Sequence, residues 1–249
     1  MRIFWDNEIN EDATLSVSSN EAANPKRFLY DSYLSNFWLA TGNTSEYVQI
    51  DAGSGNTIDV NAVGIAGHNL TSGATIKIQG NATDSWTSPS LDETITWQAD
   101  TIMHFRASTA QYRYFRLSLA DSGNSSNIQI GHLFFGTYLQ MPGFSSNVQI
   151  QENYEATRNI NRAGGVKGSM DYYYRTVNVR FVDMTNSKRN DILTMMRSVY
   201  NYKPIYCAVW ENDLTFEPPI YGVISGTAIQ SLKSRGTTFT FPLQIREVR

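Results

Sequence analysis

The sequence predicts an all-β protein of two domains, with a jelly-roll β-sandwich over residues 1–140 and a second β-sandwich with one α-helix over residues 141–249. Three observations support this fold class. Short segments of alternating apolar and polar residues recur along the chain, separated by loops rich in Gly, Ser and Asn. The charged fraction is 17%, below the roughly 25% of an average domain. A single segment has the apolar spacing of an amphipathic helix.

Seven or eight short strands are expected in the first domain. Turn-rich loops such as Gly53-Ser54-Gly55-Asn56 separate them. The expected strands are Ala13–Ser18, Tyr47–Ala52, Ile58–Gly67, Ala74–Gln79, Thr94–Trp97, Ile102–Arg106, Tyr112–Leu119 and Ile128–Tyr138. The last two flank a polar loop and should close the domain, because Met141-Pro142-Gly143 then interrupts the strand pattern.

Some of these segments carry a family pattern. Trp38 precedes a strand that ends in Asp51-Ala52-Gly53, and Tyr114-Phe115-Arg116 lies in a later strand. In this order they resemble the discoidin-like, galactose-binding-like jelly roll, in which a tryptophan precedes a strand ending in Asp-Leu-Gly and a Tyr-x-Arg strand recurs. The resemblance covers about residues 1–138 and implies that Trp38 fills the core. Such domains bind glycans, bind lipids or serve as plain interaction domains, so the fold does not settle the ligand.

One loop is a candidate sugar-binding site. A sugar-binding jelly roll is expected to use loops at one end, where an exposed aromatic side chain stacks on the sugar ring and short polar side chains bond its hydroxyl groups. Trp86, Asn81 and Asp84 lie together in a polar loop and are the candidate ligand-binding residues. The alternative is that Trp86 folds back onto the sandwich and only packs there.

The second domain should combine strands with one helix. Met170–Asp183 predicts its longest strand. The helix should begin after Thr185-Asn186-Ser187, which are good capping residues, and end near Tyr200. One apolar stripe on it comprises Ile192, Met195, Met196 and Val199.

Six further strands are expected around this helix: Phe144–Gln151, Tyr154–Ile160, Ile205–Trp210, Ile220–Ser225, Ala228–Leu232 and Thr237–Arg246. Pro242 lies in the last of them. Because proline cannot donate to a strand ladder, it indicates an edge strand or a bulge.

The order of these elements is similar to the ring-forming β-domain of phage tail proteins, particularly distal tail and minor tail proteins. The similarity lies in a long strand, one helix, Lys203-Pro204, and strands that end in a Phe-x-Phe-x-Leu-x-Ile pattern. It implies a homo-oligomeric ring that contacts other tail proteins, a location in the virion tail and synthesis in the host cytoplasm. Ring closure needs a head-to-tail interface. Its candidate residues are Gly164 and Gly165 in a Gly-rich loop and Tyr172 and Tyr174 in the long strand.

Charge differs between the two halves. Residues 1–140 carry seven Lys or Arg and 14 Asp or Glu, a net charge of −7, whereas residues 141–249 carry 13 and nine, a net charge of +4. Such asymmetry can orient subunits, although two independently solvated surfaces would give the same numbers. The overall acidity argues against nucleic-acid binding. No apolar stretch approaches a membrane span, and no membrane insertion is expected.

No enzyme activity, cofactor or metal site is expected. His68, His104 and His132 are scattered, and none has another ligand type at metal-binding spacing. Cys207 is the only cysteine and lies in an apolar run, which is typical of a buried, unreactive thiol. The main interpretation is therefore a structural tail protein. The alternatives are a carbohydrate-binding module for host adhesion and a hydrolase with carboxylates from distant loops.

Overall fold

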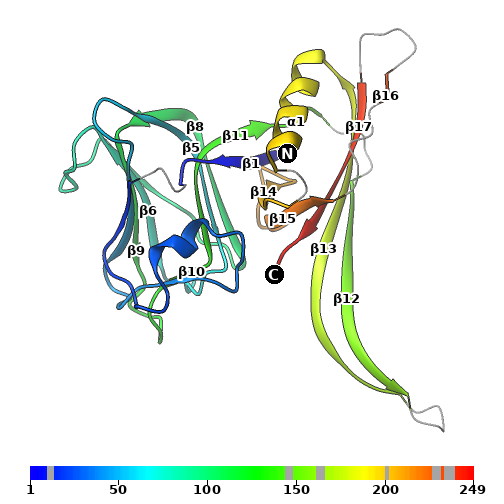
Figure 1. The fold of residues 1–249 in the computed structure, drawn as a ribbon, viewed down its shortest axis with the longest axis horizontal. Coiled ribbons are helices and arrows are strands. Elements are labelled where there is room, and N and C mark those ends of the chain that lie inside the picture. The colour runs from blue at the N-terminus through cyan, green and yellow to red at the C-terminus, as the bar shows by residue number, and fades with distance from the viewer. Residues whose placement is uncertain (10–13, 144–147, 161–165, 200–201, 226–230, 233–238) are drawn as a thin grey trace. The chain divides into compact units, whose positions relative to one another are not determined.

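The computed structural model describes residues 1–9, 14–143, 148–160, 166–199, 202–225, 231–232 and 239–249 (Figure 1). Two compact units divide the chain. The first comprises Met1–Gln140 and Tyr206–Pro219, and the second comprises Met141–Ile205 and Ile220–Arg249. Strands dominate both units, and α1 (Asn186–Val199) is the single α-helix among the described residues, which confirms the predicted all-β class with one helix.

Residues 206–219 depart from the expected domain division, which placed them in the second domain. They belong to the first unit because β14 (Ile205–Ala208) pairs with β1 (Arg2–Asn7), where Ile3 is the register partner of Cys207. Pairing between segments about 200 residues apart leaves no trace in local sequence periodicity. A continuous domain over residues 141–249 is therefore wrong at this segment.

The first unit is a sandwich of two antiparallel sheets. One sheet has the strand order β14-β1-β11-β5-β8 and the other has the order β2-β4-β9-β6-β7, while β3 and β10 form a separate pair. The 3-10 helix η1 spans Lys26–Tyr30. The remaining strands are β2 (Thr14–Val17), β3 (Trp38–Leu39), β4 (Glu46–Asp51), β5 (Ile58–Ala66), β6 (Thr75–Asn81), β7 (Leu91–Thr94), β8 (Thr101–Tyr112), β9 (Tyr114–Ala120), β10 (Gln129–Ile130) and β11 (His132–Gln140).

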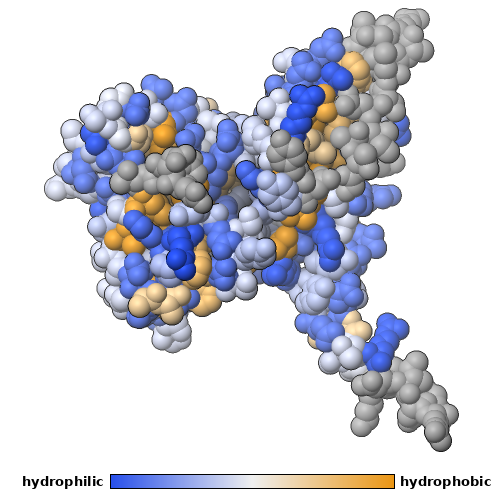
Figure 2. All heavy atoms as spheres, in the orientation of Figure 1, coloured by the Kyte–Doolittle hydropathy of each residue, from blue (hydrophilic) through white to orange (hydrophobic). Residues whose placement is uncertain are grey.

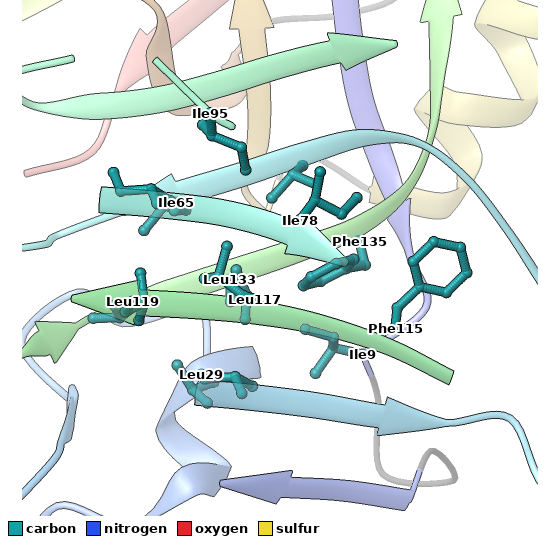
Figure 3. Packing of buried hydrophobic residues seen from close by; sticks show 14 of the residues in the cluster. Ile9, Leu29, Ile65, Ile78, Ile95, Phe115, Leu117, Leu119, Leu133 and Phe135 are labelled. Carbon is teal, nitrogen blue, oxygen red and sulfur yellow. The ribbon is translucent and has the colours of Figure 1, made fainter. Parts of the chain in front are cut away.

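Alternating residues of the two sheets fill the core between them. Phe115, Leu117 and Leu119 of β9 face Leu133 and Phe135 of β11, and all five side chains are fully buried (Figure 3). The two strands expected to close the domain thus lie in opposite sheets, since β9 pairs with β4 and β6 while β11 pairs with β1 and β5.

Trp38 fills the core as expected. Its side chain is completely buried, and its indole Nε1 donates a hydrogen bond to the carbonyl oxygen of Ser19 at 3.0 Å. A buried tryptophan needs such a partner because its N–H group would otherwise lose its hydrogen bond to water.

The second unit contains an antiparallel sheet and α1. Its strand order is β12-β13-β17-β15, and β16 (Ser231–Leu232) also pairs with β17. The strands are β12 (Gln149–Ile160), β13 (Val166–Met184), β15 (Ile220–Ser225) and β17 (Phe239–Glu247). As predicted, β13 is the longest strand, and the helix buries Ile192, Met195 and Val199.

Pro242 lies in an internal strand, so the expectation of an edge strand is wrong. The alternative expectation was a bulge, and the pairing of β13 with β17 does shift register between Phe181 and Met184, close to Pro242. β13 flanks β17 on one side, and β15 and β16 flank it on the other. Among the described residues, β16 reaches only Thr240 and β15 begins only at Gln244. Pro242 therefore lies between the part of β17 that pairs with β16 and the part that pairs with β15. Its missing N–H donor breaks no hydrogen bond to these two strands.

Candidate functional site

The outer face of the sheet β2-β4-β9-β6-β7 carries polar and aromatic side chains. Val48 and Ile50 of β4 and the alternate apolar residues of β9 belong to the buried core, so Tyr47, Gln49 and Arg116 between them point outward. Strand register then sets their neighbours, because Arg116 of β9 is the register partner of Gln49 on one side and of Gln79 on the other. Five residues form one contact group on this face, and we call Tyr47, Gln49, Asp84, Trp86 and Arg116 the Arg116 cluster.

Trp86 folds back onto this sheet face. Its side chain is partly buried, and the guanidinium carbon of Arg116 lies 5.4 Å from a ring centroid of the indole. Nε1 of Trp86 donates to Oδ1 of Asp84 at 2.7 Å, and Nε2 of Gln49 donates to the same oxygen at 3.1 Å. Asp84 thereby ties the loop tryptophan to β4. Trp86 thus packs against the sandwich, which was the alternative to sugar binding. The rest of its indole surface remains accessible.

Asn81, the third predicted ligand-binding residue, organises the loop. Its Nδ2 donates to the carbonyl oxygen of Ser85 at 2.8 Å, and its Oδ1 accepts from the hydroxyl of Ser90 at 3.1 Å and from the backbone NH of Ala82 at 3.0 Å. These bonds occupy both ends of the amide. The structure thus brings Trp86 and Asp84 into direct contact and places Asn81 at the base of their loop. Ligand binding by the three residues remains a prediction.

Sequence reasoning missed the role of Arg116 in this cluster. Its guanidinium lies over the ring of Tyr47 at 4.1 Å as well as beside Trp86. Its Nε is buried and has no hydrogen-bond partner among the described residues. Burial lowers the pKa of Arg116, against the opposing charges of Tyr47 and Asp84. An arginine at an outward strand position beside aromatic residues was the available signal, but only the register brings Tyr47 and Trp86 to it.

Two other arginines of the first unit are paired with carboxylates. Arg113 donates from Nε and Nη2 to the two oxygens of Asp51 at 2.7 and 2.9 Å, and this bond lowers the pKa of Asp51. Arg106 makes an equivalent two-point contact with Glu93, with both distances 2.9 Å. Bidentate pairing is the preferred geometry between arginine and carboxylate.

A second surface feature surrounds η1. A hollow of about 380 Å³ is lined by Arg27, Phe28, Tyr30, Asp31 and Ser32. The side chain of Asp31 is already engaged, because Asn36 Nδ2 donates to its Oδ2 at 2.7 Å and the backbone NH of Tyr33 donates to its Oδ1 at 3.2 Å. The hollow combines aromatic and charged groups, but its carboxylate mainly stabilises the loop.

A long hairpin distinguishes the second unit. β13 pairs with β17 only from Thr176 to Met184, whereas β12 continues to pair with β13 from Arg175 to Val166. We call residues 152–160 and 166–175 the arm. Within the second unit the arm continues beyond the end of β17 (Figure 1). It is a two-stranded ribbon, and its described surface is mostly hydrophilic (Figure 2).

Tyrosines occupy both faces of the arm. Tyr172 and Tyr174 lie on one face with their ring centroids 6.2 Å apart, and Tyr154 and Tyr173 lie on the other, 6.3 Å apart. Tyr154 is 59% exposed and Tyr172 is 50% exposed. The two tyrosines predicted at an oligomer interface thus share one face, and their interface role remains a prediction. Gly164 and Gly165 lie outside the described residues.

The base of the arm contains a hollow of about 500 Å³. Tyr172 and Tyr174 line it together with Val223 and the C-terminal residues Arg246–Arg249. The guanidinium carbon of Arg246 lies 4.3 Å from the ring centroid of Tyr174. This hollow is therefore aromatic and basic.

The described residues contain no group of three or more His, Cys, Asp or Glu side chains that could hold a metal ion. His132 is buried, and its Nδ1 lies 3.0 Å from the hydroxyl of Tyr206. Burial lowers the pKa of His132 to about 4. The side chain of Cys207 is buried, as expected. In the portion of the chain that the structure describes, no helix is both long and apolar enough to cross a membrane.

Comparison with protein-family models and with curated proteins gives no match. Several solved structures are similar in fold. One is CpGH89CBM32-6 from Clostridium perfringens, with 17% identity, a TM-score of 0.40, and coverage of 52% of this chain and 98% of the other. A second is the family 32 carbohydrate-binding module of C. perfringens NanJ in complex with galactose, with 15% identity, a TM-score of 0.40, and coverage of 51% and 93%. A third is chitosan-binding module 2 of a Paenibacillus sp. IK-5 chitosanase/glucanase in complex with chitotriose, with 14% identity, a TM-score of 0.40, and coverage of 50% and 96%.

Proposed function

We propose that the chain is a non-enzymatic structural subunit that assembles through its second unit, as a component of a phage tail of the distal or minor tail type. The arm is the observation that carries this proposal. An isolated two-stranded ribbon is at best marginally stable in water, because it has no core of its own. Exposed tyrosines on both faces suit a surface that becomes buried against a neighbouring copy.

The outer edge of β12 supports the same proposal. Among the described residues, β12 pairs only with β13, so its other edge is available to a partner strand. Glu152, Glu155 and Arg158 lie along this strand, and charged residues on an edge oppose indiscriminate pairing. A ring would use such an edge in a head-to-tail contact, in which opposite net charges of the two halves of the sequence favour one orientation.

The test is the mass of the purified full chain, measured by light scattering over a concentration series and combined with negative-stain imaging. We expect a discrete multimer or rings. A strict monomer at every concentration, in a protein that is also absent from purified virions, would overturn the proposal. Turnover of any polysaccharide would contradict its non-enzymatic part.

The second candidate function is carbohydrate binding by the first unit, with host-surface adhesion as its purpose. The Arg116 cluster favours it, because a partly accessible indole lies beside the exposed carboxylate of Asp84. Aromatic rings stack on the apolar faces of sugars, and carboxylates accept hydrogen bonds from their hydroxyl groups. Titration of the full chain with galactose and chitotriose, the sugars bound in two of the similar modules, would start the test. A glycan array without any signal would remove this candidate.

A further inference from the structure

Arg116 differs from Arg106 and Arg113, two arginines of the first unit that are paired with carboxylates. Arg106 and Arg113 each bind a carboxylate through two nitrogens. Arg116 lies on an outward strand position and makes neither a hydrogen bond nor an ion pair with any residue that the structure describes. Its contacts there are the two aromatic rings.

The rings fix the guanidinium without satisfying its donors. Tyr47 and Trp86 hold it through cation–π contacts, while Nε is buried and unpaired. A buried donor without a partner is costly, and an arginine fork held in one position loses little further freedom on binding an anion. Nε is the guanidinium nitrogen that is both buried and unpaired, so the two terminal nitrogens keep access to solvent.

Asp84 is the carboxylate next to this guanidinium, but its hydrogen bonds orient Trp86. Its Oδ1 accepts from Trp86 Nε1 and from Gln49 Nε2. Asp84 therefore orients the indole beside Arg116 and leaves the fork of Arg116 open. The arrangement places an open two-point anion receptor next to an aromatic ring.

We propose that the Arg116 cluster binds an acidic sugar, a uronic or ulosonic acid, with the sugar carboxylate on the guanidinium of Arg116 and the sugar ring against Trp86. This inference rests on the second candidate function and names its ligand class. The ligand carboxylate forms the two-point contact that Asp51 and Glu93 form with Arg113 and Arg106. Trp86 adds the stacking surface, and Asp84 sets its orientation.

The experiment compares acidic sugars with their neutral counterparts on the full chain. Galacturonate, glucuronate and N-acetylneuraminate are titrated beside galactose, glucose and N-acetylglucosamine, with binding followed by ligand-observed NMR. We expect at least one acidic sugar to bind about tenfold or more tightly than its neutral counterpart, the scale of a charge-assisted hydrogen bond. This preference should shrink as the salt concentration rises.

Three variants assign the site. Arg116→Met keeps most of the side-chain volume and should abolish the preference for the acidic sugar, with the unfolding transition retained. Arg116→Lys keeps the charge without the planar fork and should retain only part of the preference. Asp84→Asn removes a negative charge near the guanidinium but keeps an acceptor for Trp86 Nε1, so it should raise the preference for the acidic sugar over the neutral one several-fold.

Several outcomes would overturn the proposal. Equal binding of acidic and neutral sugars, or full binding in both Arg116 variants, would remove Arg116 from recognition while carbohydrate binding itself stood. An absence of binding to every acidic sugar, together with binding of a neutral one, would give the same result. An absence of binding to both classes would remove the acidic-sugar site and the carbohydrate-binding candidate together.

Discussion

Arg175 and Glu247 form an ion pair at 2.8 Å where β13 leaves the sheet and enters the arm, with 9% and 5% of their side chains exposed. The backbone NH of Arg175 also donates to the other carboxylate oxygen of Glu247 at 2.8 Å. Burial alone would raise the pKa of Glu247, but the hydrogen bonds and charge of Arg175 outweigh it and lower this pKa. Glu247 thus holds the base of the arm through both the side chain and the backbone NH of Arg175.

Replacing Glu247 should strongly destabilise the second unit. Glu247→Gln leaves the guanidinium of Arg175 buried with reduced compensation, and we expect the free energy of unfolding to fall by about 3 kcal/mol. Urea unfolding of the full chain would measure it. Asp191→Asn, which removes the exposed helical partner of Lys188, is the control in the same unit and should change stability by less than about 1 kcal/mol. Equal effects of the two variants would contradict this account.

Because the pKa of Glu247 is lower in the folded chain than in the unfolded chain, the pair stabilises the fold fully above the unfolded pKa. Its contribution is lost as the pH falls through the folded pKa, when the unfolded state binds the proton first. Stability should therefore decline in acid below about pH 4.5. The Glu247→Gln variant should show a shallower decline over that range, and a parallel decline in both proteins would argue against the pair as its source.

His132 should make the stability of the first unit depend on pH in a range above that of Glu247. Its folded pKa of about 4 lies below the unfolded value, so the unfolded state binds a proton first as the pH falls from about 6.5. Stability should be flat above this range and fall by a few kcal/mol between pH 6.5 and 4. Burial also lowers the pKa of His68 and His104, so the difference between the parent chain and His132→Gln isolates the His132 contribution. An unchanged pH slope in that variant would refute the assignment.

A substitution of Gly64 tests whether residues 206–219 pack in the first unit, because Gly64 lies against Tyr206. A Cβ atom at position 64 would lie 2.9 Å from ring carbons of Tyr206, closer than packed atoms allow. Gly64→Ala should cost about 1–3 kcal/mol through forced movement of the tyrosine ring. Gly73→Ala is the matched control, because its nearest atom would lie at an ordinary 3.7 Å. Thermal unfolding of both variants would separate them, and similar melting temperatures would contradict the contact.

Trp86 should matter for binding more than for stability. Trp86→Ala removes a stacking surface and one cation–π contact, so the free energy of unfolding should fall by only about 1 kcal/mol. Sugar binding by the first unit should be lost. Trp38→Ala is the contrasting variant, because it empties a fully buried site and should cost about 3–5 kcal/mol. Intact sugar binding in a folded Trp86→Ala chain would exclude the loop as the site.

The arm tyrosines should control assembly. A Tyr154→Ser, Tyr172→Ser double variant removes exposed aromatic surface from both faces of the arm and should shift any multimer toward smaller species. Tyr33→Ser, at a tyrosine of the first unit that is 68% exposed, is the control and should leave the mass unchanged. Light scattering at matched concentrations would compare them. A multimer that persists in the double variant would place the interface elsewhere.

Local periodicity predicted many of the elements themselves, although the strand expected at Thr94–Trp97 was wrong beyond Thr94, where β7 ends. Alternation predicted the strands that became β4 and β6, and the apolar spacing with its capping residues predicted α1. The burial of Trp38 followed from the family resemblance. These features depend on residues that are close in sequence, where side-chain period and backbone geometry act directly.

Tertiary structure alone decided which distant residues meet. Strand register across β4 and β9 brings Tyr47 to Arg116, and β14 returns Tyr206 to the first unit through pairing with β1. The internal position of Pro242 likewise depends on where β15 and β16 begin and end along β17. No local pattern encodes these choices, because register and partner are set by the burial of whole sheet faces and by segments far apart in the chain. The sequence therefore determined most of the strands and the helix, and the packing of the sheets determined the Arg116 cluster and the arm.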